Sequence, residues 1–220
     1  MLRFFSEELL SANRYEPGFV VAMRDRAGIE EVKLYVDGIY KLELVGGGGG
    51  YGQNYSAVTS YFYFAGGGSA ASFVGNVKLY AGEYQGVVGS RGENDYGNMS
   101  TGTHTGENGG NSVFQTVSGT AIITAGGGKG GKVTSGGGMT GGAAGTLNRH
   151  DNDTADEVAA KTGSGTKGNA NIIPVQGISP VYSKYSDSYG RGAGYPSQTL
   201  GRDSTSGFFR LTFLRTGDLR

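Results

Sequence analysis

The sequence lacks cysteine and tryptophan altogether, and it has only four prolines and two histidines among 220 residues. Without cysteine the chain forms neither a disulfide-stapled scaffold nor a zinc-thiolate site. The 19 basic side chains balance the 19 acidic ones, so charge gives no argument for nucleic acid or an anionic membrane surface as a partner. Its apolar runs are only a handful of residues long, too short to insert into a membrane.

The first residues, MLRFFSEELLSANRYEP, contain no recognisable signal peptide. Arg3, Glu7 and Glu8 interrupt the stretch that would have to be apolar. We therefore expect synthesis in the cytosol without an export signal. Ser6 could cap a short helix that stops at Pro17, and an extended arm that docks on another protein is equally compatible with this segment.

Glycine is the residue in excess, with 44 of 220 positions, of which 41 follow Val45. This shift divides the chain into residues 1–45, an arm and β-hairpin expected to serve attachment, and residues 46–220, a glycine-rich β domain with surface recognition loops. Because glycine costs conformational entropy, a stable product needs backbone hydrogen bonding and close backbone packing. The 14 tyrosines and 10 phenylalanines recur in strand-like runs, which argues against a flexible linker.

Alternation of apolar and polar residues predicts strands near both ends of the chain. Residues 32–44 alternate on either side of a turn signal at 37–38 and predict a β-hairpin. The closing run SGFFRLTFLR predicts a half-buried strand whose buried face carries Phe209, Leu211 and Phe213. We expect this strand to join the sheet that contains YKLELV, which would close the domain.

Three short apolar runs are each followed directly by a glycine block. YKLELV precedes the glycines at 46–50, SYFYFA precedes those at 66–68, and TAIITA precedes those at 126–128. Without a Cβ, left-handed extended segments of about three residues per turn can pack at backbone distance. The sequence therefore predicts an all-β fold, an antiparallel β-sandwich-like framework. This framework carries either long glycine-rich loops or packed polyglycine-II-like segments, and the pattern leaves both open.

The motifs that suggest chemistry fail on mechanism. GGGKGGKV, residues 126–133, resembles a phosphate-binding loop, but Val133 stands where a magnesium-binding Ser or Thr is required. The acidic cluster between His150 and Asp156 departs from the calcium-loop spacing. No nucleophile–base or paired-carboxylate spacing is present, so we expect no enzymatic activity, no catalytic residues, no cofactor and no metal site.

Two segments, 91–112 and 178–207, combine Tyr, Ser and Gly, the first with Asn as well, as antibody loops do. The second is the better candidate for a recognition surface, although its tyrosines could instead only cover the glycine layer. The expected receptor-binding residues are Tyr182, Lys184, Tyr185, Asp187, Tyr189, Arg191, Tyr195 and Arg202.

The runs IYKLELVGGGGGYG, VKLYAGEYQGVVGSRG with GGNSVFQT, AIITAGGGKGG and SGFFRLTFL follow one another along residues 32–214. In this order and spacing they resemble the glycine-rich domain of bacteriophage tail proteins, tail fibres and distal adhesins. The resemblance implies a β-framework with glycine-rich loops or polyglycine helices, mounted at a tail or fibre tip, with variable loops that contact the host cell. The chain departs from it where NRHDNDTADEVAAK interrupts the glycine runs between 136 and 170.

The role implied by this resemblance is host recognition by the virion. As a tail or tail-fibre tip adhesin, the chain would attach to other tail or fibre proteins through its N-terminal region. It would bind a host cell-surface glycan or outer-surface protein, and we expect a homo-oligomer, most simply a trimer, in the virion tail. The alternative is a purely structural virion or surface-filament subunit with a glycine-rich packing surface.

Overall fold

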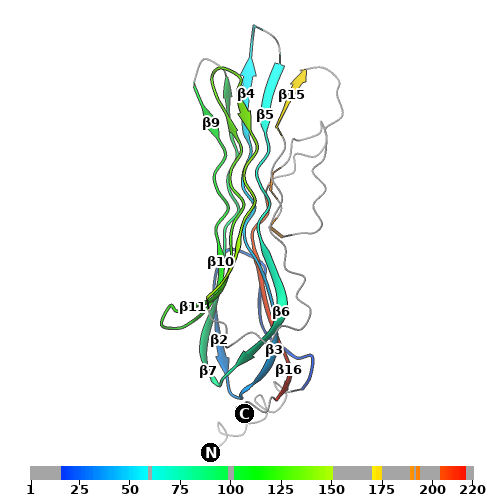
Figure 1. Ribbon diagram of the computed structural model, residues 1–220, viewed down its shortest axis with the longest axis vertical. Coiled ribbons are helices and arrows are strands. Elements are labelled where there is room, and N and C mark those ends of the chain that lie inside the picture. Colours follow the sequence, from blue (N-terminus) through cyan, green and yellow to red (C-terminus); the bar gives the residue numbers. More distant parts are fainter. Residues whose placement is uncertain are drawn as a thin grey trace, which may run out of the picture.

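The computed structural model describes residues 16–58, 61–98, 102–150, 170–174, 189–190, 192–193 and 204–216. All of its described secondary-structure elements are strands. Figure 1 shows an elongated molecule, with a wide β-sandwich at one end, wavy extended segments in the middle and short strands at the other end. We call these parts the base, the glycine bundle and the tip. The expected all-β, largely antiparallel framework is confirmed.

The base consists of two antiparallel sheets. One has the order β1 (Val20–Arg24), β16 (Phe208–Thr216), β3 (Gly38–Val45) and β6 (Ser72–Leu79). The other has the order β14 (Leu147–Arg149), β11 (Ala121–Ala125), β10 (Ser112–Thr116), β7 (Gly82–Val88) and β2 (Gly28–Leu34). The first and last described strands, β1 and β16, therefore both lie in the base.

The pairing of β16 with β3 confirms the expected closure of the domain by its last strand. The hairpin predicted over residues 32–44 does not form. β2 pairs with β7, whereas β3 pairs with β16 and β6, so the connection at residues 35–37 crosses from one sheet to the other. Alternation shows which face of a strand is buried, but a tight turn can join facing sheets as well as neighbouring strands.

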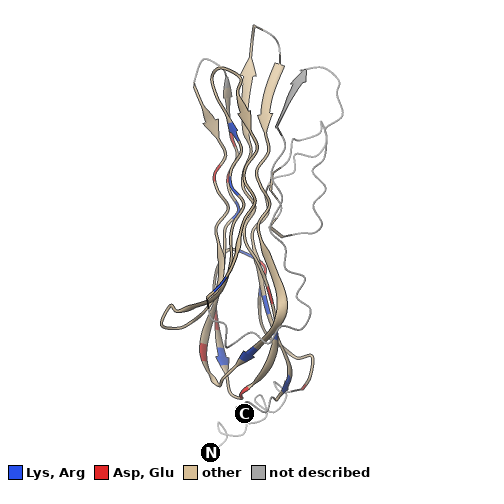
Figure 2. Ribbon diagram, in the orientation of Figure 1, with Lys and Arg blue, Asp and Glu red and all other residues tan. Residues whose placement is uncertain are grey.

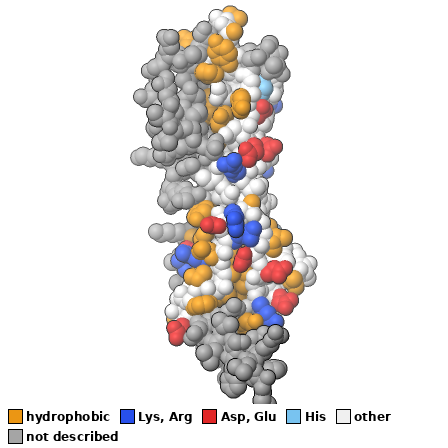
Figure 3. All heavy atoms as spheres, turned by 180° about the vertical axis from the view of Figure 1, so that it is seen from behind, with side chains coloured by type: hydrophobic (Ala, Val, Ile, Leu, Met, Phe, Trp, Pro, Cys, Tyr) orange, Lys and Arg blue, Asp and Glu red, His pale blue; other side chains and the backbone are white. Residues whose placement is uncertain are grey.

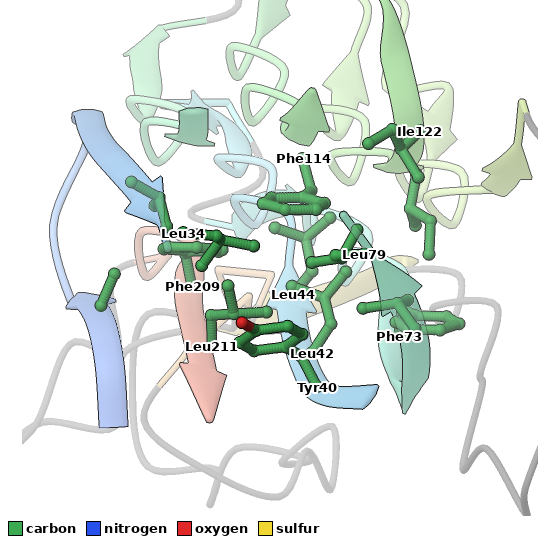
Figure 4. Packing of buried hydrophobic residues seen from close by; sticks show 14 of the residues in the cluster. Leu34, Tyr40, Leu42, Leu44, Phe73, Leu79, Phe114, Ile122, Phe209 and Leu211 are labelled. Atoms are coloured by element: carbon green, nitrogen blue, oxygen red, sulfur yellow. The ribbon is translucent and has the colours of Figure 1, made fainter. Parts of the chain in front are cut away.

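Alternate residues of the base strands fill a single apolar core (Figure 4). On β16, Phe209, Leu211 and Phe213 are at most 1 % exposed, as the sequence predicted. The ring of Phe114 on β10 stacks on that of Phe209, with centroids 5.8 Å apart, and so joins the two sheets. Burial of such a side chain contributes about 1.5–3 kcal/mol, so the base is stabilised in the ordinary way, by side-chain packing.

The glycine bundle is formed by chain segments that continue the base strands without side-chain packing. Its central segment, residues 46–51, donates and accepts backbone hydrogen bonds in a three-residue repeat. Gly47 and Gly50 both donate to segment 106–111, and both accept from segment 126–131. Gly48 and Gly49 exchange bonds of the same kind, 2.8–3.0 Å long, with Thr205, Gly92, Gly68 and Ala193. A repeat of three with no internal bonds is that of a polyglycine-II helix, so the second of the two expected options is the one formed.

Close approach, and not an unusual backbone conformation, is what requires glycine in this bundle. None of residues 46–50 has a positive φ. A Cβ on Gly49 would lie only 2.1 Å from the carbonyl oxygen of Lys129. In the outer segment 89–94, by contrast, only Gly89 and Gly92 face inward and are buried, and the positions between them carry exposed side chains. A segment surrounded by other segments on all sides therefore needs glycine at every position, whereas an outer segment needs it only at the positions that face inward.

An ion pair on the outer face of the base gives a pH-dependent stability. Glu43 on β3 lies directly opposite Arg210 on β16, whose guanidinium donates a hydrogen bond to its carboxylate. This bond, with a smaller contribution from Lys41, whose ammonium is 3.4 Å away, lowers the pKa of Glu43 although its partial burial opposes the shift. A lowered pKa stabilises the folded state above the ordinary value of about 4.3, and the stabilisation is lost as the pH falls through the lowered pKa.

We therefore expect Glu43→Gln to destabilise the protein by about 0.5–1 kcal/mol at pH 7, a value limited by the partial exposure of Arg210. Thermal unfolding of both proteins between pH 7 and pH 2 measures this difference, which should disappear at the acid end. A difference that stays constant over the whole range would contradict the assignment.

Candidate recognition surface at the tip

The tip is built from strands that extend the segments of the glycine bundle. One sheet has the order β15 (Ala170–Pro174), β5 (Tyr61–Ala65), β4 (Gly52–Ser56) and β8 (Asp95–Asn98). The other has the order β13 (Met139–Thr140), β12 (Lys132–Val133) and β9 (His104–Thr105), and it lies against the first. Strands β4, β5, β8, β9, β12 and β13 each continue into a segment of the glycine bundle, so the bundle positions both sheets away from the base (Figure 1).

One face of the sheet β5-β4-β8 carries aromatic side chains and no charge. Tyr55 pairs with Phe62 across the antiparallel strands, and Gln53 has Phe64 on one side and Tyr96 on the other. Because paired residues share a face of a sheet, these five side chains lie on one face, which we call the aromatic face. Within it Phe64 is buried, whereas Gln53, Tyr55 and Phe62 are half-buried. Tyr55 and Phe62 have ring centroids 5.2 Å apart, and Tyr96 is 73 % exposed.

The end of the β4–β5 hairpin adds further exposed apolar groups. Val58, after β4, is 97 % exposed, and Tyr61 at the start of β5 is 39 % exposed. In Figure 2 strands β4 and β5 bear no charged residue. In Figure 3 hydrophobic side chains gather on the uncovered part of the tip, and most charged side chains lie nearer the middle and the base. Exposed apolar groups grouped in this way mark a binding surface more often than isolated ones do.

The carboxylate of Asp95 joins the two sheets of the tip. Its Oδ1 lies 2.9 Å from Nδ1 of His104, and its Oδ2 accepts a hydrogen bond from the backbone N–H of Thr105 at 2.8 Å. The buried amide of Asn54 on β4 donates to the carbonyl of Gly102, which precedes β9, at 3.2 Å. These polar contacts hold β9 against β4 and β8, so they position the strands that carry the aromatic face.

Among the described residues, no group of three His, Asp or Glu side chains is arranged to hold a metal ion. Nor does the described part of the chain contain a helix long and apolar enough to cross a membrane.

Of the eight receptor-binding residues expected from the sequence, only Tyr189 lies among the described residues. Its ring stacks on Phe208, the first residue of β16, with centroids 4.6 Å apart. This places Tyr189 where the base meets the glycine bundle, away from the tip. Outside the described residues lie Tyr182, Lys184, Tyr185, Asp187, Arg191, Tyr195 and Arg202, whose expected role stays a prediction.

Sequence reasoning missed most of the aromatic face. Tyr96 lies in segment 91–112, which the composition had marked as a second recognition segment, but Tyr55 and Phe62 were not singled out. A usable signal was present, because the run between the glycine blocks 46–50 and 66–68 contains aromatic residues on both sides of the stretch SAVTS. A hairpin between two glycine segments lies at the far end of the bundle from the base, and aromatic residues there are candidates for a surface.

A family model described as Glycine-rich domain matches residues 37–216, which includes β3, the whole glycine bundle and β16. No curated protein matches the chain. The matched region runs from the residue before β3 to the end of β16, two strands that pair in the base, and it leaves out β1 and β2. The chain belongs to the glycine-rich domain family.

Proposed function

We propose that this chain is a host-recognition protein of a bacteriophage virion, a tail or tail-fibre tip adhesin that binds a host cell-surface receptor through its tip. The observation that carries the proposal is that the two ends of the elongated molecule differ. The first and last described strands lie together in the base, and an uncharged aromatic surface lies at the opposite end of the glycine bundle (Figure 1). This arrangement suits attachment at one end and contact at the other.

The assignment to a phage tail rests on the order of the glycine-rich motifs in the sequence. The proposal includes attachment to other tail or fibre proteins through the N-terminal region and assembly into a homo-oligomer.

The test measures binding of fluorescently labelled protein to a panel of bacterial cells. We expect saturable binding to some members of the panel. A protein that binds no member of a broad panel of Gram-negative and Gram-positive cells would contradict the proposal.

A second candidate function, that of a structural virion or filament subunit, is favoured by apolar side chains on the edge strands of the base. Met23 on β1 is 52 % exposed and Ile29 on β2 is 54 % exposed. Exposed apolar edge strands can pair with neighbouring copies. Sedimentation of the purified protein separates the two functions, since an adhesin should form a discrete species and a filament subunit should polymerise.

A further inference from the structure

We propose that the aromatic face binds a neutral glycan. The inference rests on the proposed function, because it names the chemical class of receptor that this surface of an adhesin would recognise. Its basis is the combination of one exposed ring and two half-buried rings with an amide group, and the absence of charge among the described side chains of the face.

The side chains of the aromatic face match the chemistry of a sugar ring. A pyranose presents a face of C–H groups that packs on the negative face of an aromatic ring, and its hydroxyls need hydrogen-bond donors and acceptors. Tyr96 offers an exposed ring and a phenolic hydroxyl, and the amide of Gln53 lies beside it in the sheet. An amide both donates and accepts, which suits hydroxyl groups.

The lack of charge selects among glycans. The five side chains of the aromatic face carry no formal charge, and neither do Val58 and Tyr61 at the hairpin end. Acidic polysaccharides and phosphorylated core sugars are bound most strongly by Arg and Lys, and strands β4 and β5 contain neither. A neutral oligosaccharide avoids the cost of leaving a charge without a partner.

The packing of the rings prepares the face for binding. Tyr51 and Phe64 have centroids 5.3 Å apart, and Tyr55 and Phe62 are held in the same way, so the strands present aromatic groups in fixed positions. A surface that is already ordered loses little conformational entropy when a ligand binds. Tyr96 is the most exposed ring of the set, so it is the residue whose removal should affect binding most.

The test uses the full chain and an array of bacterial oligosaccharides that pairs neutral chains with chains bearing uronate or phosphate. We expect binding to neutral members, lowered about tenfold in Tyr96→Ala and largely retained in Tyr96→Phe, which keeps the ring. Tyr35→Ala is the matched control, since Tyr35 is 50 % exposed in the base. Exclusive binding to charged chains, or equal loss in the Tyr35 variant, would overturn the inference.

Binding experiments on treated bacterial cells distinguish a failure of this inference from a failure of the proposed function. Binding that is abolished by periodate oxidation of surface sugars, and that survives protease treatment, supports the glycan. Binding that is abolished by protease and survives periodate overturns it in favour of a protein receptor, while the adhesin role stands. Binding to the array without binding to any cell overturns the adhesin role alone, and no binding to either overturns both.

Discussion

Replacement of Gly49 by alanine is expected to lower the free energy of unfolding by at least about 3 kcal/mol, or to prevent folding. The new Cβ would lie 2.1 Å from the carbonyl oxygen of Lys129 and 2.4 Å from its carbonyl carbon. These are backbone atoms of a neighbouring segment that is itself hydrogen-bonded, so no side chain can rotate away to make room. Thermal unfolding followed by circular dichroism measures the effect.

Gly136→Ala is the matched control for this substitution. Gly136 is exposed between β12 and β13, has no positive φ, and has no atom within 4 Å of the position of a Cβ. Its replacement by alanine should change stability by less than about 1 kcal/mol, in either direction. If both variants unfolded at the temperature of the wild type, the close packing of the glycine bundle would be refuted.

Phe114→Ala is expected to destabilise the protein by about 3–5 kcal/mol. The side chain of Phe114 is completely buried in the base, and its ring stacks between those of Tyr84 and Phe209. Its removal leaves a cavity between the two sheets, because the surrounding strands are fixed by their ladders and cannot close the gap. Chemical denaturation gives the free energy of unfolding directly.

Val117→Ala provides the comparison for the core variant. Val117 follows β10 on the same segment of chain and is 56 % exposed, so its truncation should change stability by no more than about 0.5 kcal/mol. Equal effects of the two substitutions would mean that the apolar core of the base does not stabilise the fold.

These two pairs of variants separate two ways of stabilising one chain. The base is stabilised by the packing of apolar side chains. The glycine bundle is stabilised by backbone hydrogen bonds between segments whose buried positions are glycine. Both must be intact for the tip to be held away from the base, because strands β4, β5, β8, β9, β12 and β13 of the tip continue into the bundle (Figure 1). Substitutions in the bundle that destabilise the fold should therefore impair binding even though they touch no ligand.

Much of the base could be predicted from the sequence. The alternation of Phe209, Leu211 and Phe213 indicated both the last strand and its buried face, and the pairing with β3 followed from closure of the domain. The partners of β2 could not be predicted in the same way. Alternation is a property of one strand, whereas pairing depends on how two sheets face each other, so the turn at 37–38 was compatible with a hairpin and with a crossing between sheets.

The sequence predicted packed polyglycine helices as one of two possible structures for the glycine blocks, but it did not decide between them and loops. A block such as 46–50 can be a loop or a packed helix, and its own residues do not decide between them. The decisive signal lies in the outer segments, where Gly89 and Gly92, like Gly106 and Gly109, recur at intervals of three and are buried. Loops have no reason to keep such a period, whereas a helix of three residues per turn requires it on the side that faces its neighbours.

The candidate site was less predictable, because composition identifies segments suited to recognition but not their place in the fold. Tyr189 and Tyr96 both lie in segments rich in Ser and Gly, yet Tyr189 packs on Phe208 and Tyr96 lies exposed on the tip. Only the arrangement of the glycine segments distinguishes the two positions, since it determines which part of the chain lies far from the base.

The central claim is that the tip, and not the base, contacts the host cell. The most direct test compares cell binding by Val58→Asp, at the end of the β4–β5 hairpin, with cell binding by Ile29→Asp on an exposed edge of the base. Both substitutions place one negative charge at an exposed position, so neither should disturb folding, which circular dichroism would verify. We predict that Val58→Asp weakens binding at least about tenfold and that Ile29→Asp leaves it unchanged, whereas the opposite pattern would contradict the account.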